Sequence, residues 1–288
     1  MKAAEVSSLV KYLSPAGATL SIEERMQLEL SLLSLYERES FEEVYLWGRV
    51  TGVLKDYYIA MTLNFKGHAE FPLKRFFWTN NQVWTFAELP EVGQAEAKLA
   101  EQFNSYFSGE HDKILVEVGR PTVPQYARDE DEEDSIPQDS RSKNFTELER
   151  LSVIVRSIES DCQLVPEGAY LLTPAHELGP NPHFKGLSRL QLRDQGKYYH
   201  FRPVKSLEKR ELLDRGIGPE ATDFLDPVEK DMPRGCWKLQ LDSSKTQVAV
   251  RSLYWPGYIA FAVAETRTFG GFYAGDGIKN KDLPFMLS

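Results

Sequence analysis

The sequence has very little cysteine and no long apolar run. Its 288 residues include only Cys162 and Cys236, too few for a disulfide scaffold and typical of a reducing compartment. The purest apolar run is YIAFAVA, far short of the roughly 20 residues that span a bilayer. The N-terminal stretch MKAAEVSSLVKYLSPAGATL lacks the apolar core of a secretory signal. We therefore expect a cytoplasmic protein without a membrane segment.

Positive charge is also in short supply. The chain has 34 Lys and Arg against 43 Asp and Glu, a net charge of −9, and its pI is near 5.2. A nucleic-acid-binding protein needs a basic surface for phosphates, and a peripheral membrane protein needs one for anionic lipids. The composition therefore argues against both kinds of partner. With 42% hydrophobic and 27% charged residues, the chain is typical of a folded protein with a hydrophobic core.

The sequence also lacks a recognisable catalytic motif. His176, Glu177 and His183 lie close together in HELGPNPH and are the best candidates for the metal site of an unrecognised enzyme. The prolines in this segment prevent the helix that an HExxH zinc site requires, so a polar loop is the simpler interpretation. The glycine-rich GGFYAGDG lacks the spacing of a phosphate-binding loop, and tight β-turns explain its glycines. Cys162 has no activating neighbour in the sequence, which favours a buried thiol.

A helix is predicted from Leu20 to Tyr36. Ser21 is a suitable N-cap, and two glutamates follow it in the first turn, where the helix dipole favours acids. Two apolar rows lie at helical spacing, formed by Met26, Leu30 and Leu33 and by Leu28, Leu32 and Leu35. A surface helix needs only one such row. We therefore expect this helix to lie between a sheet and a second surface.

The residues after this helix favour strands. Glu42–Leu63 is rich in β-branched and aromatic residues, and we expect Gly48 and Gly52 to mark bulges or close backbone contacts. The polar Thr79–Gln82 separates two aromatic segments and predicts a hairpin. Further helices are predicted over residues 93–105 and after Thr146. The fold class is therefore α+β, with antiparallel sheet flanked by helices, an N-terminal helical region and a long acidic loop.

That loop lies between Gly119 and Lys143, where three prolines flank the segment RDEDEED. The six consecutive acids Asp129–Asp134 repel one another and bury no apolar surface, so we expect a flexible surface loop. The loop suggests a division of the chain into an N-terminal helical region (1–40), a first α/β part (41–128), the acidic loop (129–143) and a second α/β part (144–288).

Several blocks of the sequence resemble successive segments of the radial spoke head protein 9 family. They occur in the family's order, and their combination is more specific than any one of them. The blocks are EEVYLWGRVTGVLKDYYIAMTL (Glu42–Leu63), LVPEGAYLLTP (Leu164–Pro174), YYHFRP (Tyr198–Pro203), DMPRGCWKLQ (Asp231–Gln240), VRSLYWPG (Val250–Gly257) and GDGIKNKDLPFML (Gly275–Leu287).

The resemblance implies a non-enzymatic structural subunit of the radial spoke head, without a cofactor, in the axoneme of cilia and flagella. Radial spokes relay mechanical signals from the central pair that regulate dynein. The expected partners are radial spoke head proteins 4 and 6 and other spoke-head subunits, with transient contact to central-pair projections. The alternatives are a soluble adaptor outside cilia and an enzyme with a metal site at His176, Glu177 and His183.

The same blocks supply candidate structural or interface residues. We expect Trp47 to lie in the core, because it belongs to a strand pattern. In the C-terminal KNKDLPFMLS, Pro284 favours an extended path that would lay four apolar side chains in a groove. The groove belongs either to the chain's own sheet, which we favour, or to a spoke-head partner. The full set of candidates is Trp47, Gly48, Arg49, Tyr57, Tyr58, Trp255, Pro256, Gly257, Leu283, Phe285, Met286 and Leu287.

Overall fold

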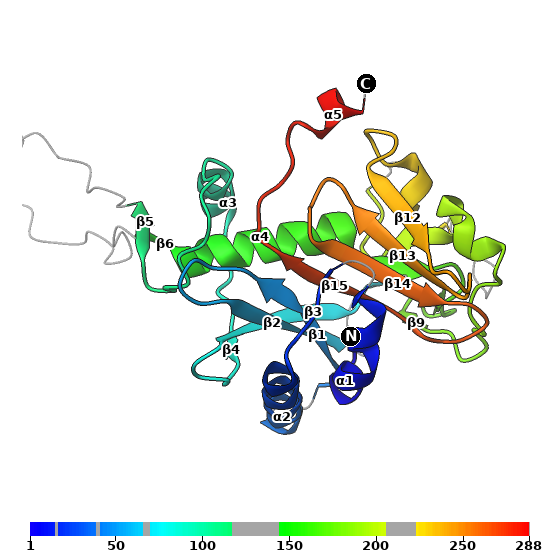
Figure 1. Cartoon of the computed structure of the whole chain (residues 1–288), viewed down its shortest axis with the longest axis horizontal. Coiled ribbons are helices and arrows are strands. Elements are labelled where there is room, and N and C mark those ends of the chain that lie inside the picture. The colour runs from blue at the N-terminus through cyan, green and yellow to red at the C-terminus, as the bar shows by residue number, and fades with distance from the viewer. Residues whose placement is uncertain (15–16, 39–40, 66–69, 117–143, 206–222, 288) are drawn as a thin grey trace, which may run out of the picture.

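The fold is built on one large sheet. The computed structural model describes residues 1–14, 17–38, 41–65, 70–116, 144–205 and 223–287. Within them, an eight-stranded sheet has the order β12-β13-β14-β15-β1-β2-β3-β4 (Figure 1). Its strands are β1 (Glu43–Val50), β2 (Tyr57–Asn64), β3 (Leu73–Asn80), β4 (Ala87–Glu88), β12 (Trp237–Leu241), β13 (Gln247–Ser252), β14 (Tyr258–Val263) and β15 (Phe269–Gly275).

The two halves of this sheet come from opposite ends of the chain. Neighbouring strands pair antiparallel throughout, except at the junction, where β1 pairs parallel to β15 and Gly48 lies opposite Tyr273. The register of β1 against β2 shifts between Leu46 and Gly48, which is the bulge that the glycine predicts. Close backbone contact is confirmed at Gly52, where a Cβ would lie 2.1 Å from the carbonyl oxygen of Lys55.

Both faces of the sheet are covered, which makes three layers. On one face lies α4 (Glu147–Cys162), and on the other lie α1 (Val6–Leu9) and α2 (Ile22–Arg38) (Figure 1). Because side chains alternate along a strand, Tyr57 packs with the core cluster on the α4 side and Tyr58 with the cluster on the α2 side. The sheet therefore carries a hydrophobic core on each face.

The two long helices begin where their capping residues predict. At α2, the Ser21 hydroxyl accepts from the backbone N–H of Glu24, whose carboxylate accepts from the N–H of Ser21. Thr146 and Glu149 form the same capping box at α4. A shorter helix, α3, spans Gln94–Ala100 after Gly93. The helices predicted from the sequence are thus confirmed, although α3 is shorter than expected.

The prediction that α2 lies between the sheet and a second surface is confirmed only for the side that packs on the sheet. Its inner row of Leu28, Leu32 and Leu35 is buried against the sheet. The other row faces solvent, and we call it the outer row. It consists of Ile22, Met26, Leu30, Leu33 and Tyr36, with exposed fractions of 72%, 60%, 62%, 46% and 50%.

Smaller elements complete the fold. The hairpin predicted at Thr79–Gln82 is confirmed, with β4 as its short return strand. Three small sheets surround the large one, formed by β5 (Ile114–Val116) with β6 (Phe145–Thr146), β8 (Tyr170–Leu172) with β9 (Leu178–Pro180), and β7 (Leu164–Pro166) with β10 (Tyr198–His200) and β11 (Asp226–Pro227). The chain ends in α5 (Leu283–Met286), and short 3₁₀ helices occupy Ala3–Glu5, Val10–Tyr12, Gln191–Arg193, Gln195–Lys197 and Val228–Lys230.

These elements confirm the α+β fold class. None of the helices in the described ranges has the length and apolar character needed to cross a bilayer. The acidic stretch Asp129–Asp134 lies outside the described residues. The division into four segments stays a prediction, and the parts before and after the acidic stretch contribute strands to the same large sheet.

Candidate functional site

The aromatic block of β1 around Trp47 lies inside the molecule. Trp47 is only 4% exposed, and its ring packs against Tyr273 at a centroid distance of 5.6 Å. Its indole Nε1 donates to the Glu159 carboxylate of α4 at 2.8 Å, and Lys74 of β3 donates to the same carboxylate at 2.6 Å. A Cβ on Gly48 would lie 2.5 Å from the carbonyl oxygen of Tyr273. The expectation that Trp47 belongs to the core is confirmed.

Arg49 and Tyr58 connect β1 and β2 to α2. The Tyr58 hydroxyl donates to the Glu24 carboxylate, and the Arg49 guanidinium lies 3.4 Å from it. Arg49 also lies 3.7 Å from Asp56. Burial raises the pKa of the Glu24 carboxyl, but the hydrogen bonds from Tyr58 and Ser21 and the charge of Arg49 outweigh this and lower the pKa below its ordinary value. These contacts hold α2 on the sheet.

Tyr57 connects β2 to α4 on the other face of the sheet. Its hydroxyl donates at 2.8 Å to Glu147, at the start of α4. The Glu147 carboxylate also accepts from the backbone and hydroxyl of Ser108 and from the N–H of Gly109. Burial alone raises the pKa of Glu147, but these hydrogen bonds together lower it below the ordinary value. An ionised carboxylate thus connects α4 to the sheet and to the loop between α3 and β5.

The Trp255–Gly257 turn is mostly internal as well. Trp255 is buried, and its Nε1 donates to Asp161 at 3.0 Å, a carboxylate that also pairs with Lys279. Gly257 has φ +100°, and a Cβ there would lie 2.4 Å from a carbonyl oxygen of β15, so only glycine fits. Pro256 is the exposed member of the turn.

The C-terminal candidates divide between core and surface. Leu283 is 3% exposed, whereas Phe285, Met286 and Leu287 are 81%, 67% and 39% exposed. The expected extended path is wrong, because residues 283–286 form the helical turn α5. Proline is compatible with the first turn of a helix, where its missing N–H costs nothing. The turn buries one apolar side chain and presents the others outward.

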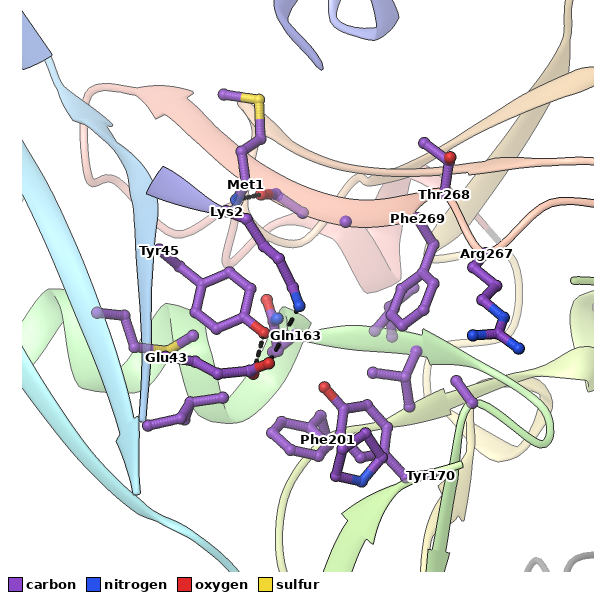
Figure 2. A pocket seen from close by; sticks show the side chains of 18 of the residues that line it. Met1, Lys2, Glu43, Tyr45, Gln163, Tyr170, Phe201, Arg267, Thr268 and Phe269 are labelled. Carbon is purple, nitrogen blue, oxygen red and sulfur yellow. Dashed lines mark hydrogen bonds and ion pairs between the residues drawn. The ribbon is translucent and has the colours of Figure 1, made fainter. Parts of the chain in front are cut away.

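A cavity of about 480 Å³ opens between the N-terminal residues, β1 and the loops around β9 and β15 (Figure 2). Its wall is aromatic, with Tyr45, Tyr170 and Phe269 among the lining residues. The Glu43 carboxylate accepts from the Tyr45 hydroxyl and from Lys2 at 3.1 Å. Burial, together with the neighbouring tyrosine and carboxylate, raises the pKa of the Tyr45 hydroxyl. Lys2 and Glu43 thus form an ion pair at the wall of the cavity, beside a tyrosine that stays protonated.

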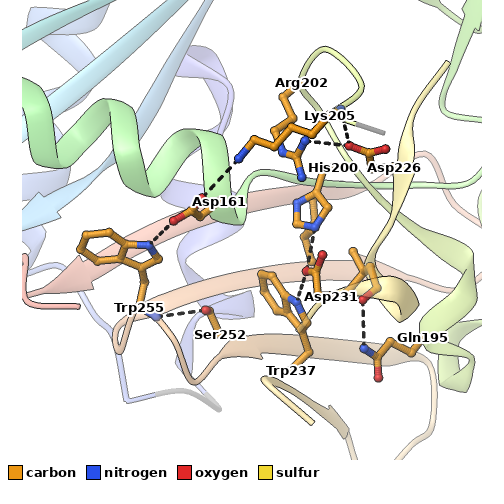
Figure 3. Close-up of polar contacts among 12 residues, drawn as sticks. Asp161, Gln195, His200, Arg202, Lys205, Asp226, Asp231, Trp237, Ser252 and Trp255 are labelled. Carbon is orange, nitrogen blue, oxygen red and sulfur yellow. Dashed lines mark hydrogen bonds and ion pairs between the residues drawn. The ribbon is translucent and has the colours of Figure 1, made fainter. Parts of the chain in front are cut away.

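A second polar cluster joins the small β10 sheet to β12 (Figure 3). His200 Nε2 lies 2.8 Å from the Asp231 carboxylate, which also accepts from the Trp237 indole at 2.7 Å. These three residues line a cavity of about 280 Å³, and Cys162 and Cys236 line it as well. Burial raises the pKa of both thiols, that of Cys236 to about 11. A histidine–aspartate pair thus lies near two cysteines that stay protonated, so it lacks an activated sulfur nucleophile.

The metal candidates do not form a site. His176 lies at positive φ in the turn between β8 and β9, and His183 is exposed in the following loop. Across the described residues, no cluster of three or more His, Cys, Asp or Glu side chains is placed to hold a metal ion. The candidate set His176, Glu177 and His183 therefore gains no support.

Sequence reasoning missed the carboxylates that receive the aromatic donors, of which Glu147 and Glu159 are buried and Asp161 is partly buried. Glu147, Glu159 and Asp161 all lie on α4, and each accepts from a tyrosine or tryptophan of the family blocks. They could have been recognised from their position in a helix whose other residues are mostly apolar or buried, because a carboxylate in such a helix needs a hydrogen-bonding or charged partner.

Comparisons with known proteins find relatives that match nearly the whole chain. The model of the family described as radial spokehead-like protein matches residues 1–75. The radial spoke head protein 9 homolog of Danio rerio is 33% identical over 94% of each chain. Those of Mus musculus and Homo sapiens are 32% and 29% identical, each over 95% of both chains. The chain belongs to the radial spoke head protein 9 family, structural proteins of the radial spoke head in the axoneme of cilia and flagella.

Proposed function

We propose that the chain is a non-enzymatic subunit that holds the radial spoke head together and passes mechanical force through it. In this role it assembles with radial spoke head proteins 4 and 6 and meets central-pair projections transiently. Force between the central pair and the dyneins then travels through a folded body whose layers are fastened to each other. The family membership supports the location, and the arrangement of the candidate residues supports the mechanism.

The observation that carries the proposal is the use made of the family's aromatic blocks. Tyr57, Trp47 and Trp255 each donate to a carboxylate of α4, with distances between 2.8 and 3.0 Å; two of these carboxylates, Glu147 and Glu159, are buried, and Asp161 is partly buried. Buried hydrogen bonds to charged acceptors are stronger than neutral ones and fix one geometry. These residues therefore hold the helix in one position on the sheet. Such a rigid arrangement suits a structural protein that transmits force better than it suits an enzyme with a catalytic pocket.

The exposed end of the chain supports contact with other subunits. Phe285 and Met286 are among the most exposed large apolar side chains described. They belong to α5, which lies at the edge of the molecule in Figure 1. Apolar side chains presented in this way mark protein–protein contacts. We assign α5 to the interface with radial spoke head proteins 4 and 6.

Co-expression with radial spoke head proteins 4 and 6 tests this assignment. The double variant Phe285→Asp with Met286→Asp should melt like the wild type but lose co-purification with both subunits, because the changes affect exposed side chains only. Leu190→Asp, at a position that is 81% exposed elsewhere on the surface, is the matched control and should still co-purify.

In ciliated cells, the α5 variant should leave spokes without assembled heads and reduce motility, whereas the Leu190→Asp control should not. If the wild-type chain fails to co-purify with spoke-head subunits and is absent from isolated spoke heads, the proposal is wrong. If the α5 variant assembles normally, the interface lies elsewhere on the chain.

A further inference from the structure

The outer row of α2 is an apolar stripe that the described part of the chain leaves uncovered. At about 100° per residue, Ile22, Met26, Leu30 and Leu33 fall within an arc of about 80°, and Tyr36 borders it. The stripe runs for about 20 Å at 1.5 Å per residue. All five side chains are between 46% and 72% exposed. Such a row is long enough to seat three to four turns of another helix.

The fold does not need these side chains. The inner row is fully buried, and α2 is capped at Ser21 and tied to the sheet through Glu24. At its far end, Arg38 donates to the carbonyl oxygen of Phe86 at 3.0 Å. The sequence therefore keeps five large apolar residues in contact with water on a helix that is already held. A contiguous apolar patch of this kind marks a protein–protein contact.

Charges beside the stripe indicate what kind of surface fits it. Glu23 and Glu37 are both exposed on one side of the row, one near each end. Arg25 and Glu29 on its other side are half-buried and already bonded, Arg25 to the Ser21 carbonyl oxygen and Glu29 to the Ser7 N–H. A second copy docked stripe to stripe in antiparallel orientation sets Glu23 of one chain opposite Glu37 of the other. Parallel docking places like ends of the two helix dipoles together. The net charge of −9 adds general repulsion between copies.

We propose that the outer row of α2 is the docking site for a basic amphipathic α-helix of another spoke-head subunit. The partner helix presents apolar residues at spacings of three and four and carries Lys or Arg where it meets Glu23 and Glu37. This assignment rests on the proposed function, since it takes the partner to be a component of the spoke head.

The stripe and the C-terminal turn are separate surfaces. In Figure 1, α2 lies below the sheet and α5 stands beyond the opposite side of it. Two such surfaces allow one chain to join two neighbours, and a test at α2 leaves the α5 interface unchanged.

Thiol footprinting in assembled spoke heads tests the proposal. Both native cysteines are buried, so a maleimide reports on a cysteine introduced at Leu30. Spoke heads are isolated from cells in which the Leu30→Cys chain replaces the native one, and labelling of its peptide is followed by mass spectrometry. Labelling should be slower than in the isolated chain by about 100-fold, as for a group that is exposed only in rare openings. Leu190→Cys is the control and should label equally fast in both states.

A charge reversal tests the chemistry of the partner. Adding Glu23→Lys and Glu37→Lys to the Leu30→Cys chain should raise labelling in spoke heads by about ten-fold or more, because it repels a basic helix. Glu91→Lys with Glu101→Lys changes two exposed acids away from the row and should have no effect. Protection that survives the reversal at Glu23 and Glu37 overturns the basic partner.

The remaining outcomes are distinct. Equal labelling of Leu30→Cys in the isolated chain and in spoke heads that contain the chain overturns this inference and leaves the proposed function standing. A chain that is absent from spoke heads overturns both. A dimer of the isolated chain in analytical ultracentrifugation, lost on Leu30→Asp, identifies a second copy as the occupant and overturns the partner helix. We expect a monomer.

Discussion

Replacing Trp47 by alanine tests whether the aromatic block is core. The change empties the space between β1, Tyr273 and α4 and removes the indole donor to Glu159. Truncating a buried tryptophan costs about 3–5 kcal/mol, a large share of the 5–15 kcal/mol that holds a typical domain folded. Because Lys74 still pairs with Glu159 at 2.6 Å, the carboxylate is not left alone, and we expect no larger loss.

Two further variants separate the packing from the hydrogen bond. Trp47→Phe keeps most of the ring but loses the donor, so it should cost about 1–2 kcal/mol. Tyr106→Ala removes an aromatic side chain that is 66% exposed and should change the stability by less than about 0.5 kcal/mol.

Urea unfolding of the isolated chain, followed by far-UV circular dichroism, measures all three variants. The midpoint should fall strongly for Trp47→Ala, modestly for Trp47→Phe and little for Tyr106→Ala, with the urea dependence unchanged. If Trp47→Ala unfolds at the wild-type midpoint, its burial contributes nothing and the core assignment of the block is refuted.

Three other substitutions test single features by the same unfolding assay. Gly257→Ala should destabilise the fold by about 1 kcal/mol or more, because φ is +100° and the added Cβ would lie 2.4 Å from a carbonyl oxygen. Gly179→Ala is the control, because open space surrounds that position, and it should not cause this loss. Leu283→Ala should cost about 2–5 kcal/mol, but Phe285→Ala should leave stability unchanged, since only the first is buried. The pKa of Glu147 is lowered from its ordinary 4.5, so its ionised carboxylate stabilises the fold fully above that pH, and this contribution is lost as the pH falls through the folded-state pKa. Glu147→Gln should therefore lower the free energy of unfolding at pH 7 and make that free energy fall less steeply in acid.

Local features of the fold were predictable from the sequence. Helix starts at Ser21 and Thr146 follow from capping residues, and the bulge at Gly48 follows from a glycine within a strand pattern. Each depends on residues a few positions apart. The two apolar rows of α2 were also visible, because helical spacing fixes which side chains share a face.

Long-range contacts were not predictable in the same way. The glycines of GGFYAGDG were attributed to tight turns, but Gly270 and Gly271 lie within β15. A Cβ on Gly270 would lie 3.2 Å from the Phe261 ring, and one on Gly271 would lie 2.5 Å from the Tyr258 hydroxyl. Neither neighbour is evident from the segment itself, because pairing between strands brings them together. The partners of the carboxylates Glu147, Glu159 and Asp161 on α4 were missed for the same reason.

The parallel junction between β1 and β15 has a consequence for biosynthesis. A ribosome releases β1 to β4 long before it makes β15, so one edge of β1 has no strand to pair with until nearly all of the described sequence has emerged. An open edge with apolar side chains on both faces is a template for aggregation in a nascent chain. We therefore expect the nascent chain to need protection during synthesis. We expect a premature stop between Asn64 and Phe269 to leave a fragment with an open sheet edge and not a smaller working subunit.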